Sequence, residues 1–412
     1  MPRPGQVKSS ADERLSDRIA LGVLTRAFPP ELVDEVVAGC GRVEQRHRLL
    51  PARVVVYFVL AMCLFSGQGY EEVARLITHR LERMGRWKTW RVPTTAAIGR
   101  ARLRLGPEPL KALFARVCRP VATEETAGSW YRGRRLVAVD GTTFDVPDTQ
   151  ANAAFFGRPG VGRGGEKSAY PQARVAALVE CGTHAVFAAE AGPLAVHETE
   201  LAQRLFGSLT PGMLVLADRG FHSFDLWRAA AATGADLLWR VKSDAVLPVR
   251  TLLEDGSYLS QIVAARDRNR RADPAHVRVI EYTLGPEGGA TTVYRLITTI
   301  LAPKAASATS LAALYAQRWE IENTLDEIKT HQGGSRLVLR SQHPAGIEQE
   351  IFGFLLVHHA LRDLMHQAAQ HSGQDPDRIS FTRTLRVIRR HVTDQAAFSP
   401  LPAGPGPDRG PA

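Results

Sequence analysis

The stretch RLVAVDGTTFDV, from Arg135 to Val146, decides the fold class of this 412-residue chain. Its apolar half, LVAV, is typical of a buried strand and ends at Asp140. The half TTFDV follows across Gly141, and because Asp-Gly is typical of a turn we predict a hairpin of two strands. A second apolar run, Met213–Ala217, ends in the same way at Asp218. Two such strands indicate an α/β sheet whose polar side chains gather at one edge.

Strands and helices alternate around these two runs. We predict three further strands and two helices, on the basis of apolar periodicity and turn residues. The strands are Arg174–Val179, Ala185–Ala189 and Ala235–Val241, and the helices are His197–Leu209 and His222–Ala232. Three early strands followed by alternating helix and strand indicate an α/β core with a mixed sheet.

The segments that flank this core have different patterns. Residues 13–118 are helical, and their apolar run Val54–Phe65 is expected to be a buried helix. Residues 244–302 are rich in β-prone residues and Gly-containing turns, which indicates a β-rich insertion. Two helices are predicted after the insertion, one from Thr309 to about Thr330 and a very apolar one over 345–371.

The positive charge of the chain is concentrated in one window. The chain has 52 Lys and Arg against 42 Asp and Glu, a net charge of +10, and residues 75–119 alone account for that excess. A confined basic patch is typical of nucleic-acid binding, whereas a solvated helical face is the alternative. Within the window, a Pro and a hydroxyl cap precede a helix with Arg100, Arg102 and Arg104, which we expect to contact DNA.

These patterns divide the chain into six predicted parts. They are a disordered start, 1–12; a helical N-terminal DNA-binding domain, 13–122; an α/β catalytic core in two pieces, 130–243 and 305–335; a β-rich insertion, 244–304; a C-terminal helical region, 336–398; and a disordered tail, 399–412.

Composition excludes several other classes of protein. No run approaches the roughly 20 apolar residues of a membrane span, and the first residues contain no apolar signal segment. The four cysteines are scattered without zinc-type spacing, at Cys40, Cys63, Cys118 and Cys181. We therefore expect a cytoplasmic, nucleoid-associated protein with reduced thiols and no membrane partner.

Asp140 and Asp218 are the first candidate catalytic residues. If their strands are neighbours, the two carboxylates converge and repel each other, and a divalent cation relieves that repulsion. Mg²⁺ prefers oxygen ligands and keeps several waters, so two or three carboxylates are sufficient to hold it. The alternative is that both aspartates simply end strands at turns.

The predicted helix Thr309–Thr330 supplies a third acid. At about 100° per residue, one stripe beside the core face carries an acid between cations and aromatic residues. The stripe consists of Tyr315, Arg318, Trp319, Glu322 and Lys329. Such a set favours a metal- and phosphate-binding stripe over ordinary helix ion pairing.

The same geometry selects Glu322 among the acids of the helix. Glu320, Asn323 and Glu327 are expected to face water on the other side of the helix. Asp326 remains the only local alternative to Glu322 as a metal ligand.

These residues resemble the signature of the DDE transposases of bacterial insertion sequences, specifically the insertion-sequence-four type. That signature is Tyr, two residues, Arg, three residues, Glu, six residues, Lys, and it matches at Tyr315, Arg318, Glu322 and Lys329. The motifs DGT from Asp140, DRGF from Asp218 and AYPQARVAALVE from Ala169 are also similar to the family's. The resemblance runs from about residue 17 to about residue 392.

The resemblance implies an RNase H-like catalytic core in which Asp140, Asp218 and Glu322 hold two Mg²⁺ ions, with Mn²⁺ as a substitute. One ion would activate water or a DNA 3′-OH, and the other would stabilise the leaving oxygen. The expected reaction is cut-and-paste transposition, in which cleavage at transposon ends is followed by strand transfer into target DNA.

The resemblance also implies how DNA is contacted. Tyr315, Arg318 and Lys329 would bind phosphates near the cut, and Trp319 is a candidate for stacking on a flipped base. The expected partners are double-stranded DNA, at the terminal inverted repeats and the target, and a second copy of the chain in a homodimeric synaptic complex.

Three other functions are considered. A stand-alone nuclease on the same core would use the same metal chemistry, but it would not need a basic N-terminal domain. A catalytically inactive, transposase-derived DNA-binding regulator would have no reason to retain Asp140, Asp218 and Glu322. A two-carboxylate glycosidase would not explain the stripe of Arg and Lys.

Overall fold

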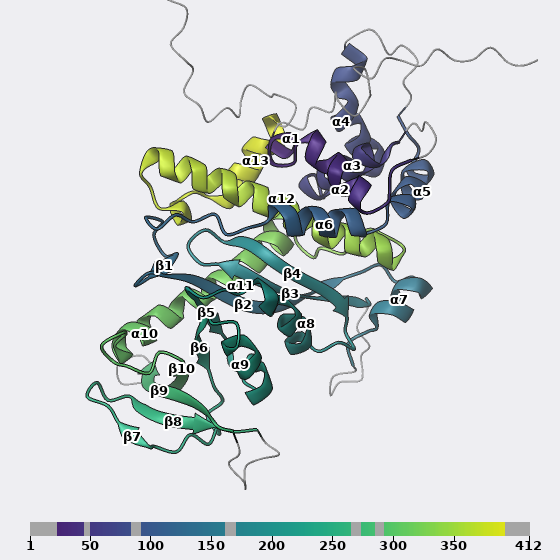
Figure 1. The fold of residues 1–412 in the computed structure, drawn as a ribbon. Helices are drawn as coiled ribbons and strands as arrows, with labels where there is room; N and C mark the ends of the chain where they lie inside the picture. Colours follow the sequence, from purple (N-terminus) through teal and green to yellow (C-terminus); the bar gives the residue numbers. More distant parts are fainter. Residues whose placement is uncertain are drawn as a thin grey trace, which may run out of the picture.

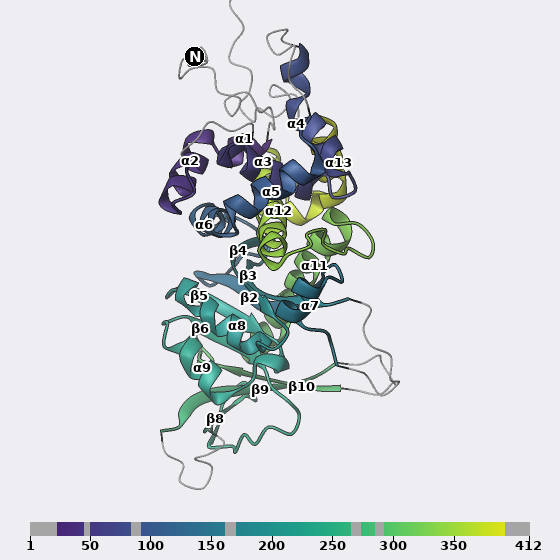
Figure 2. The ribbon, with the colours of Figure 1, turned by 90° about the vertical axis from the view of Figure 1, so that its right-hand side faces the viewer.

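The computed structural model describes residues 23–44, 50–83, 92–160, 170–264, 273–284 and 292–391. One large sheet lies below a layer of helices, and further helices cover its faces (Figures 1 and 2). The predicted disordered ends, 1–12 and 399–412, lie outside the described residues, as does the part of the basic window from 84 to 91.

The sheet is mixed, as the sequence predicts. Its strand order is β4-β3-β2-β5-β6-β10-β9-β8-β7, and the short strand β1 (Trp130–Tyr131) pairs with β2. Strands β2, β5 and β6 are parallel neighbours, whereas β3 and β4 continue the sheet in antiparallel order. The bounds are Arg134–Asp145 for β2, Gln172–Glu180 for β3, Ala185–Pro193 for β4, Met213–Ala217 for β5 and Asp236–Arg240 for β6.

The central strand β2 is buried on both faces. Leu136 and Ala138 belong to the apolar core shared with helices α11 (Trp319–Asp326) and α12 (Pro344–Ser372). Val137 and Val139 belong to a second core under helices α8 (Glu198–Leu205) and α9 (Phe224–Ala231). This explains why the run LVAV is continuously apolar rather than alternating. Helices α8 and α9 confirm the two predicted core helices, the first continuing as a 3₁₀ turn over Phe206–Ser208.

The predicted hairpin at Gly141 is wrong. Strand β2 runs straight through this glycine, and its pairing with β3 continues from Val137↔Glu180 to Asp145↔Gln172. A partner strand along this whole length keeps the backbone extended, which local turn propensity alone does not reveal. Asp140 is therefore an internal residue of β2, not its last one.

The predicted β-rich insertion is confirmed, but its strands extend the core sheet. Strand β10 pairs antiparallel with β6, with Leu296 opposite Arg240. The remaining strands of the segment follow in the order β9, β8, β7. Their bounds are Thr251–Leu252 for β7, Tyr258–Ile262 for β8, Ala275–Leu284 for β9 and Thr292–Thr298 for β10.

Helices from both ends of the chain form the upper layer. The predicted buried helix at Val54–Phe65 is confirmed as α3 (Ala52–Leu64), and it packs against the long C-terminal helix α12. Gly353 permits this close packing, because a Cβ there would lie 2.8 Å from Cys63 Sγ. The other helices of the layer are α1 (Val23–Ala27), α2 (Pro30–Gly39), α4 (Tyr70–Arg83), α5 (Thr95–Leu105), α6 (Glu108–Val117) and α13 (Phe381–His391); α7 (Gln150–Phe156) lies at the edge of the sheet.

The segment predicted as one helix from Thr309 to about Thr330 is helical throughout but not uniform. It begins as α10 (Ala308–Leu314), tightens to a 3₁₀ turn over Tyr315–Arg318, continues as α11 and widens to a π-helix over Glu327–Gln332. These changes of pitch rotate the side chains away from an ideal helical wheel.

The described cysteines are all free thiols, as expected. No described helix is both long enough and apolar enough to span a membrane.

Candidate active site

Two aspartates lie side by side where β5 ends. The parallel register of β2 and β5 ends with Val139 opposite Ala217. Asp140 directly follows Val139, and Asp218 directly follows Ala217. Asp140 Oδ1 accepts a hydrogen bond of 2.8 Å from the Gly141 N–H. Burial raises the pKa of Asp140 to about 6, and nearby carboxylates contribute to the increase. The two strands are neighbours, which is the condition for convergence of the two acids, and Asp140 is internal to its strand.

Arg318 brings Glu322 to the same place. Its Nη2 donates to Glu322 Oε1 at 2.8 Å, and its Nη1 lies 3.7 Å from Asp140 Oδ2. Burial alone would lower the pKa of the Arg318 guanidinium, but Tyr315 and the carboxylates of Glu322 and Asp218 raise it on balance. Three acids from β2, the end of β5 and α11 thus surround one buried arginine.

The donor set of this cluster suits a hard divalent cation. Asp218 Oδ1 is buried without a hydrogen-bond partner among the described residues, and Arg240 approaches it only to 3.8 Å. The Nε of Arg318 is likewise buried without a described partner. Because the site offers carboxylate oxygens and an unsatisfied acceptor, its residues fit Mg²⁺ or Mn²⁺.

The rest of the predicted stripe is divided between buried and exposed positions. Tyr315 is buried, and its hydroxyl donates to the Ala217 carbonyl at 3.1 Å, beside Asp218. Lys329 is half-buried, with Nζ 3.2 Å from Thr142 Oγ1 on β2. Trp319 is 59% exposed, and the Arg318 guanidinium lies over its ring at 5.2 Å from the centroid.

The prediction that Glu320 and Glu327 face water is wrong, since both are buried. The physical reason is that the helix lies between the sheet and a second layer formed by α12 and the turn Pro376–Arg378, so its far side is also covered. Asn323 is exposed as predicted, and so is Asp326, which accepts a hydrogen bond from Thr330 Oγ1 at 2.6 Å.

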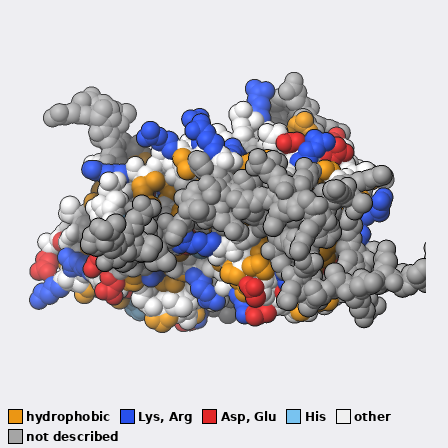
Figure 3. Space-filling model, turned by 90° about the horizontal axis from the view of Figure 1, so that it is seen from above, with side chains coloured by type: hydrophobic (Ala, Val, Ile, Leu, Met, Phe, Trp, Pro, Cys, Tyr) orange, Lys and Arg blue, Asp and Glu red, His pale blue; other side chains and the backbone are white. Residues whose placement is uncertain are grey.

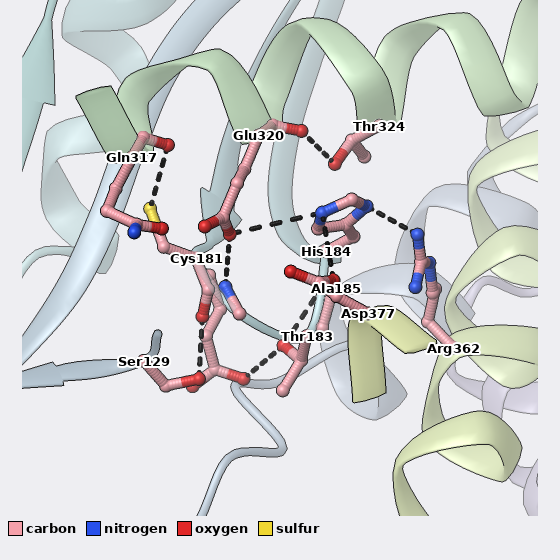
Figure 4. A network of polar contacts seen from close by, with 12 residues as sticks. Ser129, Cys181, Thr183, His184, Ala185, Gln317, Glu320, Thr324, Arg362 and Asp377 are labelled. Atoms are coloured by element: carbon pink, nitrogen blue, oxygen red, sulfur yellow. Dashed lines mark hydrogen bonds and ion pairs between the residues drawn. The ribbon is translucent and has the colours of Figure 1, made fainter. Parts of the chain in front are cut away.

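Glu320 lies in a buried polar network around His184 (Figure 4), and Glu327 belongs to the same network. Glu320 accepts a hydrogen bond from the Gly182 N–H, and its carboxylate lies 3.9 Å from His184 Nε2. On the other side, Glu327 is hydrogen-bonded to Arg362 and, at 3.0 Å, to His358 Nε2. The network ties α11 to α12 and to the turn between β3 and β4.

Ligand atoms of His184, Glu320 and Asp377 in this network lie within 4.8 Å of one another. However, Arg362 contacts His184 Nδ1, and a guanidinium can only donate. Nδ1 therefore accepts, and the neutral ring carries its proton on Nε2, which lies 3.5 Å from Asp377 Oδ1. A protonated Nε2 does not bind a metal, so this cluster is a structural hydrogen-bond network.

The three N-terminal arginines have different environments. Arg100 and Arg104 are exposed on α5, which begins at the predicted cap, Thr94. Arg102 is buried, and its guanidinium binds Gln349 Oε1 at 3.0 Å and Tyr70 Oη at 2.7 Å. The prediction that Arg102 contacts DNA is therefore wrong, because its donors are used inside the helical layer. Seen from above, Lys and Arg side chains are spread over the visible part of this layer (Figure 3).

Sequence reasoning also missed a fourth acid close to Asp140. Glu198, at the start of α8, lies against the backbone of Gly141. The local signal was the glycine that follows Asp140, which was interpreted as a turn.

In this structure a mixed sheet carries two neighbouring aspartates, a later helix adds a glutamate beside them, and a basic helical layer lies above. This combination is typical of metal-dependent enzymes that transfer phosphoryl groups in nucleic acids. The chain belongs to the transposase DDE domain family, whose model matches residues 131–358. Residues 18–115 match the insertion element 4 transposase N-terminal model.

Two Escherichia coli (strain K12) proteins are similar to this chain. The transposase InsG for insertion sequence element IS4 is 29% identical over 378 residues, which cover 90% of this chain and 83% of that protein. The putative transposase InsZ is 23% identical over 239 residues, or 58% of this chain and 77% of that protein. A cryo-EM structure of the piggyBac transposase synaptic complex with hairpin DNA aligns with a TM-score of 0.48 and 12% identity, over 91% of this chain and 80% of that one.

The chain is therefore a DNA transposase, an enzyme that cleaves DNA and transfers strands and that depends on a divalent metal. No observation favours the stand-alone nuclease, the inactive regulator or the glycosidase.

Proposed function

We propose that Asp140, Asp218 and Glu322 are the metal ligands of this transposase and that they hold two Mg²⁺ ions on an RNase H-like core. The observation that carries the proposal is the position of Arg318, bonded to Glu322 and 3.7 Å from Asp140, in a cluster where Asp218 Oδ1 has no hydrogen-bond partner among the described residues. When bound, such ions supply an activated hydroxyl nucleophile and stabilise the leaving oxygen of the phosphodiester.

The protein residues around these acids have separate roles in the proposal. Tyr315 positions the end of β5, and so Asp218, through its bond to the Ala217 carbonyl. Arg318 orients Glu322, and its charge balances the acids until the ions bind. Lys329 offers its ammonium to a DNA phosphate beside the site, and the exposed indole of Trp319 offers a surface on which a base can stack.

The wider assignments follow from the same proposal. Residues 130–243 and 305–335 form the catalytic core, 244–304 the insertion, 13–122 the domain that recognises the terminal inverted repeats, and 336–398 a helical region that supports both. Arg100 and Arg104 supply phosphate contacts in recognition of the ends. Two copies assemble on a pair of ends for cut-and-paste transposition, in the cytoplasm on the nucleoid.

The test is single-turnover cleavage of a DNA duplex that carries the element's own end. Asp140→Asn, Asp218→Asn and Glu322→Gln should each abolish cleavage while end binding in a gel-shift assay persists. Asp326→Asn, on the exposed side of the same helix, is the matched control and should cleave normally. Cleavage that survives Glu322→Gln but is lost in Asp326→Asn would overturn the choice of acid.

A further inference from the structure

Gly141 and Glu198 make an unusually close approach beside Asp140. A Cβ on Gly141 would lie 2.1 Å from Glu198 Oε1 and 2.9 Å from Glu198 Cδ, so any other residue at this position would displace the end of the Glu198 side chain. Gly141 does not adopt the left-handed conformation, so turn geometry does not explain its place within β2. The glycine instead provides the space for the Glu198 carboxylate.

The Glu198 carboxylate has no described partner that explains its position. It is half-buried, and none of the described residues forms a hydrogen bond or ion pair with it. Glu200, in the same first turn of α8, is paired with Arg204 at 2.6 Å. A helix dipole favours an acid at either position, so it does not explain why Glu198 extends onto β2.

Glu198 and Glu322 approach β2 near Asp140 from opposite faces of the sheet. Neighbouring side chains of β2 alternate between faces, with α8 covering one face and α11 the other. Because β5 has ended at Ala217, this edge of β2 is not paired with β5 at Asp140 and Gly141. The Glu198 carboxylate lies against Gly141, the residue directly after Asp140, and so reaches this open edge of the strand.

We infer that Glu198 is a fourth carboxylate of the divalent-metal site, and that it stabilises the cation held by Asp140. This inference rests on the proposed function, since it assigns Glu198 to the same site. Acids that approach one strand residue from both faces repel one another, and a cation is the partner that would make the arrangement favourable. The buried Asp218 Oδ1, an acceptor without a hydrogen-bond partner among the described residues, independently indicates that the cluster can take a cation.

The test is Mn²⁺ binding to the full chain without DNA, followed by electron paramagnetic resonance. Glu198→Gln keeps the side-chain volume and should weaken Mn²⁺ binding by about tenfold. It should also raise the Mn²⁺ concentration needed for half-maximal cleavage, while the melting temperature in EDTA stays unchanged. Glu200→Gln is the matched control and should bind Mn²⁺ like the unaltered chain. Gly141→Ala, which displaces the Glu198 carboxylate, should weaken binding in the same direction.

Two outcomes separate this inference from the proposed function. If Asp140→Asn abolishes Mn²⁺ binding and Glu198→Gln leaves both Mn²⁺ affinity and the metal dependence of cleavage unchanged, the inference on Glu198 is overturned and the three-acid site stands. If Asp140→Asn binds Mn²⁺ normally, the proposed site itself fails, and the inference fails with it.

Discussion

Arg318 donates to Glu322 across one turn of helix at 2.8 Å, in a position where only 5% of the arginine is exposed. The same guanidinium lies 3.7 Å from Asp140. A buried cation that binds two of the proposed metal ligands stabilises the site before metal arrives, because otherwise three acids would repel one another without compensation.

Arg318→Ala should therefore destabilise the protein most strongly without metal. We expect the free energy of unfolding in EDTA to fall by about 2 kcal/mol, the value of a charged hydrogen bond. Saturating Mg²⁺ should restore part of this loss, since the ions replace the missing positive charge. Urea denaturation of both proteins, with and without Mg²⁺, measures the effect. An equal loss in the two conditions would show that Arg318 contributes only packing.

Glu327 and Glu320 provide a matched pair with opposite electrostatics. Burial alone would raise the pKa of Glu327, but hydrogen bonds from His358 and Arg362 and the charge of Arg362 hold it below its ordinary range. The ionised carboxylate therefore stabilises the fold at pH values above the ordinary glutamate pKa, and this stabilisation is lost as the pH falls below it. Glu327→Gln should lower the free energy of unfolding at pH 7 by about 3 kcal/mol, with a smaller loss in acid.

Glu320→Gln should act in the other direction. Burial raises the pKa of Glu320 from 4.5 to about 8, despite the hydrogen bond from Gly182, and Asp377 adds to the increase. Its ionisation is therefore disfavoured in the folded state, and the cost to folding grows as pH rises between these two values. The glutamine variant should be more stable than the unaltered chain, with a gain that increases over this interval. Denaturation midpoints across pH 3–8.5 provide the measurement, because the loss for Glu327→Gln should shrink below the ordinary glutamate pKa and the gain for Glu320→Gln should grow above it. Parallel curves for the two variants would contradict both assignments.

These two glutamates show where sequence reasoning stops. Periodicity correctly identified the core face of the helix and the exposure of Asn323, because both depend on local spacing. It failed for Glu320 and Glu327, since their burial depends on α12 and on Asp377, which are distant in sequence. The partners of these acids are His184, His358 and Arg362, and no local pattern links them to the helix.

Asp140 shows the same limit in the sheet. The apolar run before it correctly predicted a strand. That Met213–Ala217 is its neighbour was a condition of the argument, and the pairing of β2 with β5 meets that condition. The turn at Gly141 was wrong, because pairing with β3 and the approach of Glu198 determine the local backbone there. The prediction that Arg102 contacts DNA was wrong for a related reason. The sequence gives the charge of the residue, but it does not show the distant acceptors, such as Gln349, that bind its guanidinium in the interior.

The exposed and buried arginines of α5 should separate DNA binding from stability. Arg100→Ala with Arg104→Ala should weaken end binding and reduce its salt dependence by roughly one unit of slope per lost phosphate contact. Arg102→Ala should instead lower the melting temperature, because Gln349 and Ser341 lose a buried donor. Gel shifts over a salt series and thermal melts on the same proteins provide both measurements. An unchanged slope in the double variant would place the DNA surface elsewhere.

Lys329 provides the last prediction, because its contact with Thr142 allows two explanations. Its Nζ lies 3.2 Å from Thr142 Oγ1, two residues from Asp140 on β2. If the ammonium binds a phosphate during chemistry, Lys329→Ala should slow single-turnover cleavage by about a hundredfold, the usual cost of removing one donor to developing charge. End binding should change little, since the N-terminal domain still holds the DNA.

The alternative is that Lys329 only fastens the helix to β2, and a double-mutant cycle separates the two roles. Thr142→Ala removes the fastening contact and leaves the ammonium in place. If fastening is the role, Thr142→Ala should slow cleavage as much as Lys329→Ala, and the double variant should be no worse than either. If phosphate binding is the role, Thr142→Ala should cleave at nearly the normal rate. His331→Ala alters an exposed neighbour that lies 3.6 Å from Asp326. This variant should retain full activity, which would show that loss of a polar side chain near this turn is not itself the cause.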